Sequence, residues 1–372
     1  MSGYHAVESE RLASRRAFVG AAAIGAAAVG SGLIGKAVAG RPARVSGQEV
    51  VVGSGEHQFR VVHHWPKLPS KYKWQTTHNV AVDKAGHLYV IHEGLEELAD
   101  HPSIFVFDGE GKFVRAFGEQ FQGGGHGIEV REEEGEEFLY VAAYQNRKCF
   151  AKLSLTGEVV WQRFAPMGSG RYAVGEAASP KRVWGRDRFM PTNFAFLPDG
   201  GFLLADGYGA FYIHRYDKYG NWKSCFGGPG DGKGTFQTPH GLWVDDRGDE
   251  TVLVVADRAH NTLQRMTLDG THIETIGGFG LPANLDVQGK LLLVPELVAR
   301  VTILDENNEV AVHLGEDVER LSADKSKSIR KDESKWIDGK FVHPHDACFA
   351  ADGSIFVAEW VGTGRVTKLE RV

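Results

Sequence analysis

The sequence predicts an all-β protein, a six-bladed β-propeller that occupies residues 40–372. Two observations predict it. The 372 residues include 47 glycines, an excess that suggests many tight turns and favours an all-β repeat over a helical fold. In addition, a unit of an apolar strand, an Asp-x-x-Gly turn and a second apolar strand occurs six times, at spacings of 44 to 67 residues. A period of roughly 40–50 residues with several short strands is typical of a propeller blade.

The six copies can be read directly from the sequence. Each begins with an inner strand, and these are expected in residues 78–83, 126–130, 191–196, 239–244, 282–287 and 344–349. Single blades leave apolar faces open, so neighbouring blades must pack together and the ring must close. Residues 50–62 alternate in polarity, and we expect them to supply the closing strand.

Composition excludes some classes of function. The net charge of −6 gives no reason to expect a nucleic-acid partner. Cys149, Cys225 and Cys348 are few and far apart, which indicates buried small apolar side chains rather than a disulfide framework or a Cys-type zinc site. We expect a monomer that acts on a small-molecule or peptide substrate.

Residues 1–39 resemble a twin-arginine export signal. Arg15 and Arg16 precede an Ala/Gly-rich apolar run, which is followed by the small-residue site Ala37-Val38-Ala39. This pattern predicts a bacterial protein exported to the periplasm or beyond, with no stable membrane span after cleavage. The alternative is an uncleaved anchor, for which the run is short and weakly apolar.

Two insertions lengthen the repeat. The first insertion (residues 163–190) is rich in arginine, and the second insertion (residues 316–340) mixes charges of both signs. Each runs into the start of an inner strand, so we expect loops or lids over the face where inner strands begin. The alternative for each is a solvated surface loop. The arginines of the first insertion favour an anionic substrate.

Equivalent positions of the inner strands form one ring around the axis of a propeller. Here that ring consists of four histidines and two asparagines: His78, His126, Asn193, His240, Asn284 and His345. His126, His240 and His345 come from alternate blades, so their imidazoles can meet at one point. Three neutral imidazoles with an open fourth position make a good zinc site, and His78 could add a fourth ligand. The alternative is that these histidines hydrogen-bond to the backbone between blades.

Other polar residues lie near this ring. Asp346 could orient an imidazole, bind calcium or stabilise a turn. Tyr208 and Arg258 follow second strands on the same face, where a tyrosine could act as a base and an arginine could bind a carboxylate. Interblade hydrogen bonds are the alternative for both. His63, His64 and His92 lie outside the ring pattern, and we expect them at the surface.

These motifs resemble NHL-repeat propellers, and more narrowly the peptidyl-α-hydroxyglycine α-amidating lyase domain. The resemblance covers about residues 75–370 and rests on the order of four motifs: His126-Gly127, Asp206-Gly207-Tyr208, Pro239-His240 with Ala256-Asp257-Arg258, and Pro344-His345-Asp346. It implies that His126, His240 and His345 bind zinc, that Tyr208 is the base and Arg258 an active-site arginine. It also implies a structural calcium held by Asp346 and a carbonyl near Ile128. The family splits the N–C bond of a carbinolamide and releases an amide and glyoxylate.

The sequence departs from that family in two places. The second active-site arginine expected in the first blade has no clear match, and His343 replaces the methionine beside the last zinc ligand. A metal-dependent propeller is therefore the firmer prediction, and a zinc lyase the more specific one. A non-catalytic NHL propeller that binds a partner is the alternative. A lactonase-like calcium propeller ranks lowest because it needs an acidic cluster in the channel, whereas the ring has histidine and asparagine.

Overall fold

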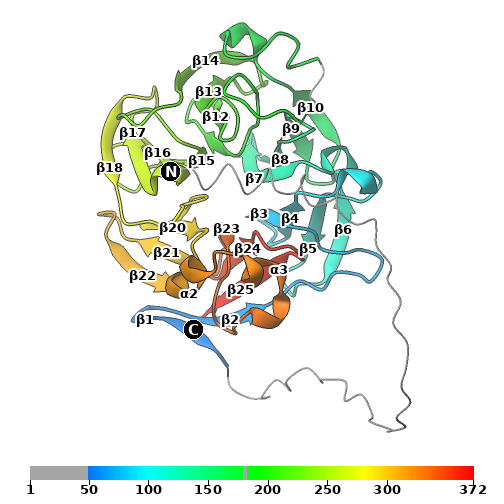
Figure 1. Ribbon diagram of the computed structural model, residues 1–372, viewed down its shortest axis with the longest axis vertical. Helices are drawn as coiled ribbons and strands as arrows, with labels where there is room; N and C mark the ends of the chain where they lie inside the picture. The colour runs from blue at the N-terminus through cyan, green and yellow to red at the C-terminus, as the bar shows by residue number, and fades with distance from the viewer. Residues whose placement is uncertain (1–48, 179–181) are drawn as a thin grey trace, which may run out of the picture. The chain divides into compact units, whose positions relative to one another are not determined.

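The computed structural model describes residues 49–178 and 182–372, so the export signal predicted in residues 1–39 lies outside the described residues. Within residues 49–372, six antiparallel sheets are arranged around a common centre (Figure 1). This confirms the prediction of a six-bladed β-propeller. Each sheet is one blade, and its innermost strand is the first strand of the repeat.

Blades one to three follow the repeat as it was predicted. Their strands, from the inner to the outer edge, are β3 (Thr77–Val82), β4 (Leu88–His92), β5 (Ile104–Phe107) and β6 (Phe113–Phe117); β7 (Gly125–Glu133), β8 (Glu136–Ala143), β9 (Cys149–Ser154) and β10 (Val159–Arg163); and β11 (Phe194–Phe196), β12 (Phe202–Ala205), β13 (Tyr212–Tyr216) and β14 (Trp222–Gly227).

Blades four to six complete the ring. Their strands are β15 (Pro239–Asp245), β16 (Val252–Asp257), β17 (Thr262–Met266) and β18 (His272–Ile276); β19 (Asp286–Gln288), β20 (Leu291–Glu296), β21 (Arg300–Leu304) and β22 (Val310–Leu314); and β23 (Pro344–Phe349), β24 (Ile355–Glu359) and β25 (Arg365–Arg371), followed by β2 (His57–His63) and β1 (Val51–Ser54).

The N-terminal strands close the ring. β2 pairs antiparallel with β25, which places Val61 opposite Leu369. The predicted closing strand is thus confirmed. The same segment also folds back on itself as the β1–β2 hairpin, which gives blade six a fifth strand that the repeat pattern did not indicate.

The Asp-x-x-Gly turns work through the aspartate and the glycine. In blade three, Asp217 Oδ1 accepts the backbone N–H groups of Tyr219 and Asn221. Gly220 has a φ of 75°, in the left-handed region that suits glycine. The turn therefore needs both residues, which explains why the pair recurs in the sequence.

The core lies between neighbouring blades. In the cluster between blades one and two, Tyr89 and Ile104 pack with Leu139 and Ala151, and all four are fully buried. Similar apolar clusters lie between the other blades. Burial of apolar surface contributes about 25 cal/mol per Å², so packing between blades is the main force that holds the ring together. Cys149 and Cys348 are buried as expected, whereas Cys225 is only partly buried.

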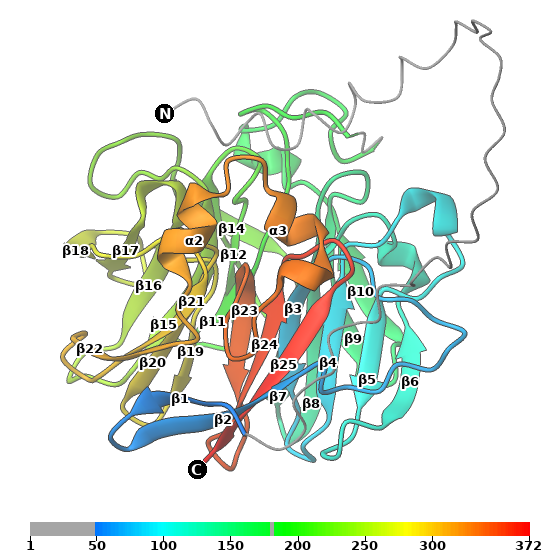
Figure 2. The same ribbon diagram turned by 60° about the horizontal axis from the view of Figure 1, so that its bottom comes forward.

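Both insertions are anchored to the propeller. The second insertion contains α2 (Val318–Ala323), α3 (Ser328–Lys331) and the 3-10 turn η5 (Glu333–Lys335), and the two helices lie at one end of the blades (Figure 2). Its Leu321 and Ile329 pack with Val361.

Further 3-10 turns are η1 (Glu96–Leu98), η2 (Glu119–Phe121), η3 (Met167–Ser169) and η4 (Arg258–His260). No helix in residues 49–178 and 182–372 has the length and apolar character needed to cross a bilayer.

Candidate metal centre on the propeller axis

A β-bulge aims each of the four ring histidines. The pairing of the inner strand with its neighbour is regular except at its start, where it skips one residue in four of the blades. The skipped residues are His78, His126, His240 and His345. A bulged residue is left out of the ladder, and its side chain can be turned away from the sheet. Asn193 and Asn284 instead lie just before the short strands β11 and β19.

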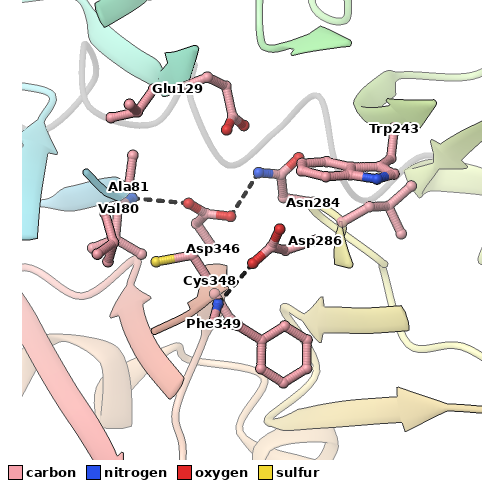
Figure 3. A pocket seen from close by; sticks show the side chains of 13 residues that line it. Val80, Ala81, Glu129, Trp243, Asn284, Asp286, Asp346, Cys348 and Phe349 are labelled. Atoms are coloured by element: carbon pink, nitrogen blue, oxygen red, sulfur yellow. Dashed lines mark hydrogen bonds between the residues drawn. The ribbon is translucent and has the colours of Figure 1, made fainter. Parts of the chain in front are cut away.

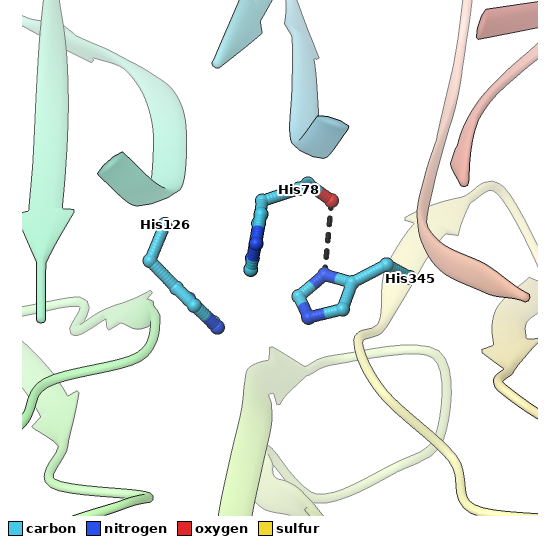
Figure 4. A group of neighbouring side chains, drawn as sticks. All are labelled: His78, His126 and His345. Carbon is cyan, nitrogen blue, oxygen red and sulfur yellow. Dashed lines mark hydrogen bonds between the residues drawn. The ribbon is translucent and has the colours of Figure 1, made fainter. Parts of the chain in front are cut away.

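The four imidazoles meet on the axis. Ring centroids are 4.8 Å apart for His126 and His240, 4.7 Å for His240 and His345, and 5.0 Å for His126 and His345. The ring of His78 lies 4.8 Å from that of His126 and 4.5 Å from that of His345. Figure 4 shows His78, His126 and His345 converging from three blades. The predicted convergence is therefore present, and all four side chains are buried.

Glycine permits this close approach of the blades. Gly127 follows His126, and a Cβ atom there would lie 2.2 Å from the carbonyl oxygen of Thr192. Gly241 follows His240, and its Cβ would lie 2.4 Å from the Cα of Asn284. Both distances are too short for any side chain, so the His-Gly pairs of the sequence reflect packing between blades as well as the site.

Three of the histidines are anchored in the same way. The Nδ1 atoms of His126, His240 and His345 lie 3.0, 2.6 and 2.9 Å from the backbone carbonyl oxygens of Thr192, Ala283 and His78. A carbonyl can only accept, so each Nδ1 carries the proton and each Nε2 presents a lone pair. This is how proteins fix metal-binding imidazoles. The Nε2 of His345 is buried and has no hydrogen-bond partner among the described residues.

His78 is held differently. Its Nε2 lies 3.5 Å from Glu93 Oε2, and Glu93 Oε1 accepts a 2.6 Å hydrogen bond from Gln145. No carbonyl anchors its Nδ1 among the described residues. Yet one potential ligand nitrogen each of His78, His126 and His345 lie within 4.8 Å of one another, so His78 belongs to the tightest group. The distances between ring nitrogens thus favour His78 as a metal ligand. The backbone carbonyl that anchors its Nδ1 favours His240 as a ligand.

Burial keeps all four imidazoles neutral. Desolvation is the largest cause that lowers the pKa of His78, and it lowers those of His126, His240 and His345 well below the ordinary value. The positive charge of Arg258 lowers all four further. A neutral imidazole is the form that binds a metal, so the site is ready to accept one at neutral pH.

Tyr208 and Arg258 lie beside this group, as the sequence suggested. The Tyr208 hydroxyl lies 2.9 Å from His240 Nε2 and 3.4 Å from His126 Nε2. Arg258 Nη1 donates to the same hydroxyl at 2.9 Å. The hydroxyl therefore donates to the lone pair of His240 and accepts from Arg258. A metal held by His240 would take that lone pair, and the Tyr208 hydroxyl would then be free to interact with a substrate.

Sequence reasoning missed Tyr144 and Glu93. The ring of Tyr144 stacks on Tyr208, with centroids 5.2 Å apart, and meets His126 edge-on at 5.0 Å. Tyr144 and Glu93 each directly follow the second strand of a blade, close to the positions that Tyr208 and Arg258 occupy in their blades. That shared position was the signal that could have found them.

Several arginines of the first insertion contact groups of the protein itself. Arg163 and Arg171 stack over Trp161 and Tyr212, and Arg188 pairs with Glu176. Aromatic rings and a carboxylate of the protein itself thus occupy them. Arg186 lies over the Phe211 ring, and its Nη2 is 3.5 Å from the Tyr208 carbonyl oxygen. Trp184 also reaches the site and meets the Tyr208 ring edge-on at 5.8 Å.

A second polar layer lies beneath the histidines. Asn193 Nδ2 donates to Glu129 and to Asn284, whose own Nδ2 donates to Asp346 Oδ1 at 2.6 Å. Asp346 Oδ2 accepts the N–H of Val80, so Asp346 does not orient an imidazole through a hydrogen bond. The two asparagines belong to this layer rather than to the imidazole group. Glu129 and Asp286, which sequence reasoning missed, complete it.

This layer lines a cavity of about 160 Å³. Figure 3 shows Glu129, Asp286 and Asp346 around it, with Asn284 between them. Desolvation is the largest cause that raises the pKa of each of the three carboxyl groups, and the charge of Asp286 raises those of Glu129 and Asp346 further. Three buried acids around one space are costly when ionised unless a cation or protons balance them.

The remaining histidines lie outside the centre. His343 Nδ1 contacts the Leu297 carbonyl oxygen at 2.5 Å, and burial lowers its pKa to about 4. His92 is buried between His101 and Phe105. The prediction that it lies at the surface was wrong because it ends a fully buried second strand. His63 and His64 are partly exposed.

Comparison with known proteins supports the fold of this chain and nothing finer. No family model matches the chain, and no curated protein matches it. The virginiamycin B lyase of Staphylococcus aureus has a similar structure, with 12% identity and a TM-score of 0.51 over 84% of this chain and 100% of that one. The structure of its catalytically inactive histidine-to-alanine variant with quinupristin has 13% sequence identity to this chain and a TM-score of 0.50, over the same shares of the two chains. A Bacteroides thetaiotaomicron protein of unknown function has 11% sequence identity and a TM-score of 0.53, and the match covers 87% of this chain and 76% of that one.

Proposed function

We propose that the chain is an exported, zinc-dependent carbon–nitrogen lyase that acts on a small, anionic carbinolamide. The observation that carries this proposal is the set of three carbonyl-anchored imidazoles beside the Tyr208–Arg258 pair. The resemblance to the α-amidating lyase domain supports the same residues. Propellers of similar fold include a lyase, and a histidine-to-alanine variant of that lyase is catalytically inactive.

The donor set fits zinc. His126, His240 and His345 offer three neutral Nε2 atoms, and burial leaves the Nε2 of His345 without any other described partner. An unpaired buried acceptor costs free energy of about 1–3 kcal/mol, which a metal would recover. We assign these three as the ligands in preference to His78, because a backbone carbonyl fixes the Nδ1–H of each, whereas no described carbonyl fixes the Nδ1 of His78. His78 then supports the centre because its backbone carbonyl accepts a hydrogen bond from the Nδ1–H of His345.

The residues of the chain have distinct roles in this reaction. When bound, zinc would polarise the carbinol oxygen as a Lewis acid. For this step Tyr208 is the phenolate, its own proton having been released to solvent. The phenolate oxygen takes the carbinol proton, and the electron pair of that O–H bond forms the new C=O bond. The C–N bond breaks, and the amide nitrogen receives its pair and the proton back from Tyr208. The products are an amide and glyoxylate, and no oxidation occurs.

Arg258 has two tasks in this scheme. Its Nη1 already donates to the Tyr208 hydroxyl, which stabilises negative charge on that oxygen while the proton is held elsewhere. The other nitrogen atoms of a guanidinium can hold a substrate carboxylate in bidentate fashion. The substrate would thus be fixed with its hydroxyl between the metal position and Tyr208.

The layer beneath the histidines suits calcium. Glu129, Asp286 and Asp346 supply carboxylate oxygens around the cavity, and Ca²⁺ prefers oxygen ligands of this kind. From the sequence, a calcium propeller ranked lowest because the ring positions carry no acidic residues. The acidic cluster lies in this lower layer instead. We propose a structural calcium here, held through Asp346 and balancing the buried carboxylates.

Removal of metal with a chelator, followed by addition of zinc or calcium alone, tests the zinc site and the calcium site separately. Protein stripped with a chelator should lose turnover of an N-acyl-α-hydroxyglycine, measured as glyoxylate release. Zinc alone should restore turnover, and calcium alone should raise the unfolding temperature without restoring it. Inactivity after full zinc loading would contradict the lyase proposal and favour a propeller that binds a partner. An unfolding temperature indifferent to calcium would contradict the calcium site.

A further inference from the structure

Two guanidinium groups contact Tyr208 at its opposite ends. Arg258, from blade four, donates to the hydroxyl at 2.9 Å. Arg186, from the first insertion, has its Nη2 3.5 Å from the backbone carbonyl oxygen of the same residue. The two positive charges therefore contact different atoms of one residue, the hydroxyl beside the histidines and the backbone carbonyl.

The fold holds Arg186 firmly. Its guanidinium lies over the Phe211 ring, 3.6 Å from the centroid. Just beyond it in the chain, Arg188 pairs with Glu176, and Glu176 also binds the buried Lys148 at 2.7 Å. These contacts tie both ends of the segment to blade two, so Arg186 is placed before any ligand arrives and little side-chain entropy is lost on binding.

One nitrogen of this group lacks an acceptor. Arg186 Nη1 is buried and has no hydrogen-bond partner among the described residues. The nearby Asp206 does not serve, because its oxygens already accept from Met190 N, Ala210 N and the Tyr172 hydroxyl. No carboxylate within the described ranges lies within 4.0 Å of Arg186. A charged donor left unpaired in this way is costly, which points to an external anion.

Trp184 adds a third aromatic ring beside Tyr208 and Tyr144. It is half-buried and meets the rings of Tyr208 and Tyr144 edge-on, with centroids 5.8 and 6.4 Å apart. Aromatic rings placed in this way favour a flat or apolar segment beside them. Tyr208 thus has a guanidinium at its hydroxyl, aromatic rings against its own ring and a second guanidinium at its backbone carbonyl.

We propose that Arg186 binds a second carboxylate of the substrate, at the end distal from the histidines. The substrate class is then a carbinolamide that carries one carboxylate on the reacting carbon and another on its acyl portion. This inference rests on the proposed function for the position of the first carboxylate. Arg186 acts here as a specificity-determining residue that the α-amidating resemblance does not supply.

Simple acids can probe this site without knowledge of the natural substrate. Succinate, glutarate and adipate carry two carboxylates at increasing separation, and propionate carries one. Titration calorimetry on the full mature chain should show at least one dicarboxylate binding more tightly than propionate. Arg186→Gln should weaken the binding of that dicarboxylate by about tenfold or more, since a hydrogen bond to a charged group is lost. It should leave the affinity for propionate unchanged.

Arg171→Gln is the matched control, because Arg171 belongs to the same insertion and also stacks on a ring, that of Tyr212. It should bind all four acids like the unaltered protein. If Arg186→Gln fails to fold, Arg186→Lys keeps the charge, loses the planar fork and should show an intermediate affinity. Equal binding of dicarboxylates by the Arg186 variants and the unaltered chain would overturn the proposal. Zinc content, measured on the same samples, reports separately on the lyase proposal.

Discussion

His240→Ala should abolish stoichiometric zinc binding and leave the propeller folded. The substitution removes one of three proposed ligands, and loss of an outer partner alone typically costs about 10- to 100-fold in metal affinity. We therefore expect zinc affinity to fall by more than about 100-fold. The side chain lies on the axis, outside the apolar clusters between blades, so the β-sheet signal in circular dichroism should persist. Elemental analysis after dialysis measures the metal.

His78→Ala is the matched control for this variant. His78 is equally buried and contacts the same imidazoles, but Glu93 faces its Nε2 and no described carbonyl anchors its Nδ1. Its backbone carbonyl, which anchors His345, remains after the substitution. We expect zinc to stay bound. The reverse result, with zinc kept by His240→Ala and lost by His78→Ala, would assign the metal to His78, His126 and His345.

Tyr208→Phe should lower kcat for carbinolamide cleavage by about 10²- to 10⁴-fold, the usual contribution of a general base. The phenyl ring keeps the stacking on Tyr144, so the fold should be unchanged. Zinc should also be retained, because Tyr208 is not a proposed ligand. Glyoxylate release under saturating substrate, with metal content checked on the same sample, measures the effect.

Tyr219→Phe provides the comparison for the loss of a tyrosine hydroxyl. Tyr219 lies in a surface turn of blade three and is 62% exposed, so its variant should retain full activity. A Tyr208→Phe protein with unchanged kcat and full zinc content would remove Tyr208 from the proposed chemistry. Loss of zinc in that variant would show instead that the hydroxyl supports the metal site.

The repeat made the fold and the histidine convergence predictable. Six similar strand pairs imply a ring, and residues at one position of a ring meet on its axis. The bulges at His78, His126, His240 and His345 were not predictable, because a skipped residue leaves no mark in the alternation of a strand this short. The distinction between His78 and His240 depends on which carbonyl faces each Nδ1, and no sequence pattern reports that.

Other parts of the site depend on long-range packing. Glu129 lies in a strand that alternates ordinarily, and only the closed ring brings it near Asp346 and Asp286. The arginines of the first insertion suggested an anionic substrate, but their aromatic partners could not be read from the sequence. Arg171 stacks on Tyr212 of β13, and that pairing becomes visible only when the insertion is folded.

X-ray absorption at the zinc edge, on the purified zinc-loaded chain and on its His240→Ala and His78→Ala variants, tests the central claim most directly. We predict three imidazole nitrogens at about 2.0–2.1 Å plus one oxygen ligand, a signal preserved in His78→Ala and degraded in His240→Ala. A chain that binds no zinc, or zinc whose coordination is the same in His240→Ala as in the unaltered protein, would contradict a centre built from His126, His240 and His345.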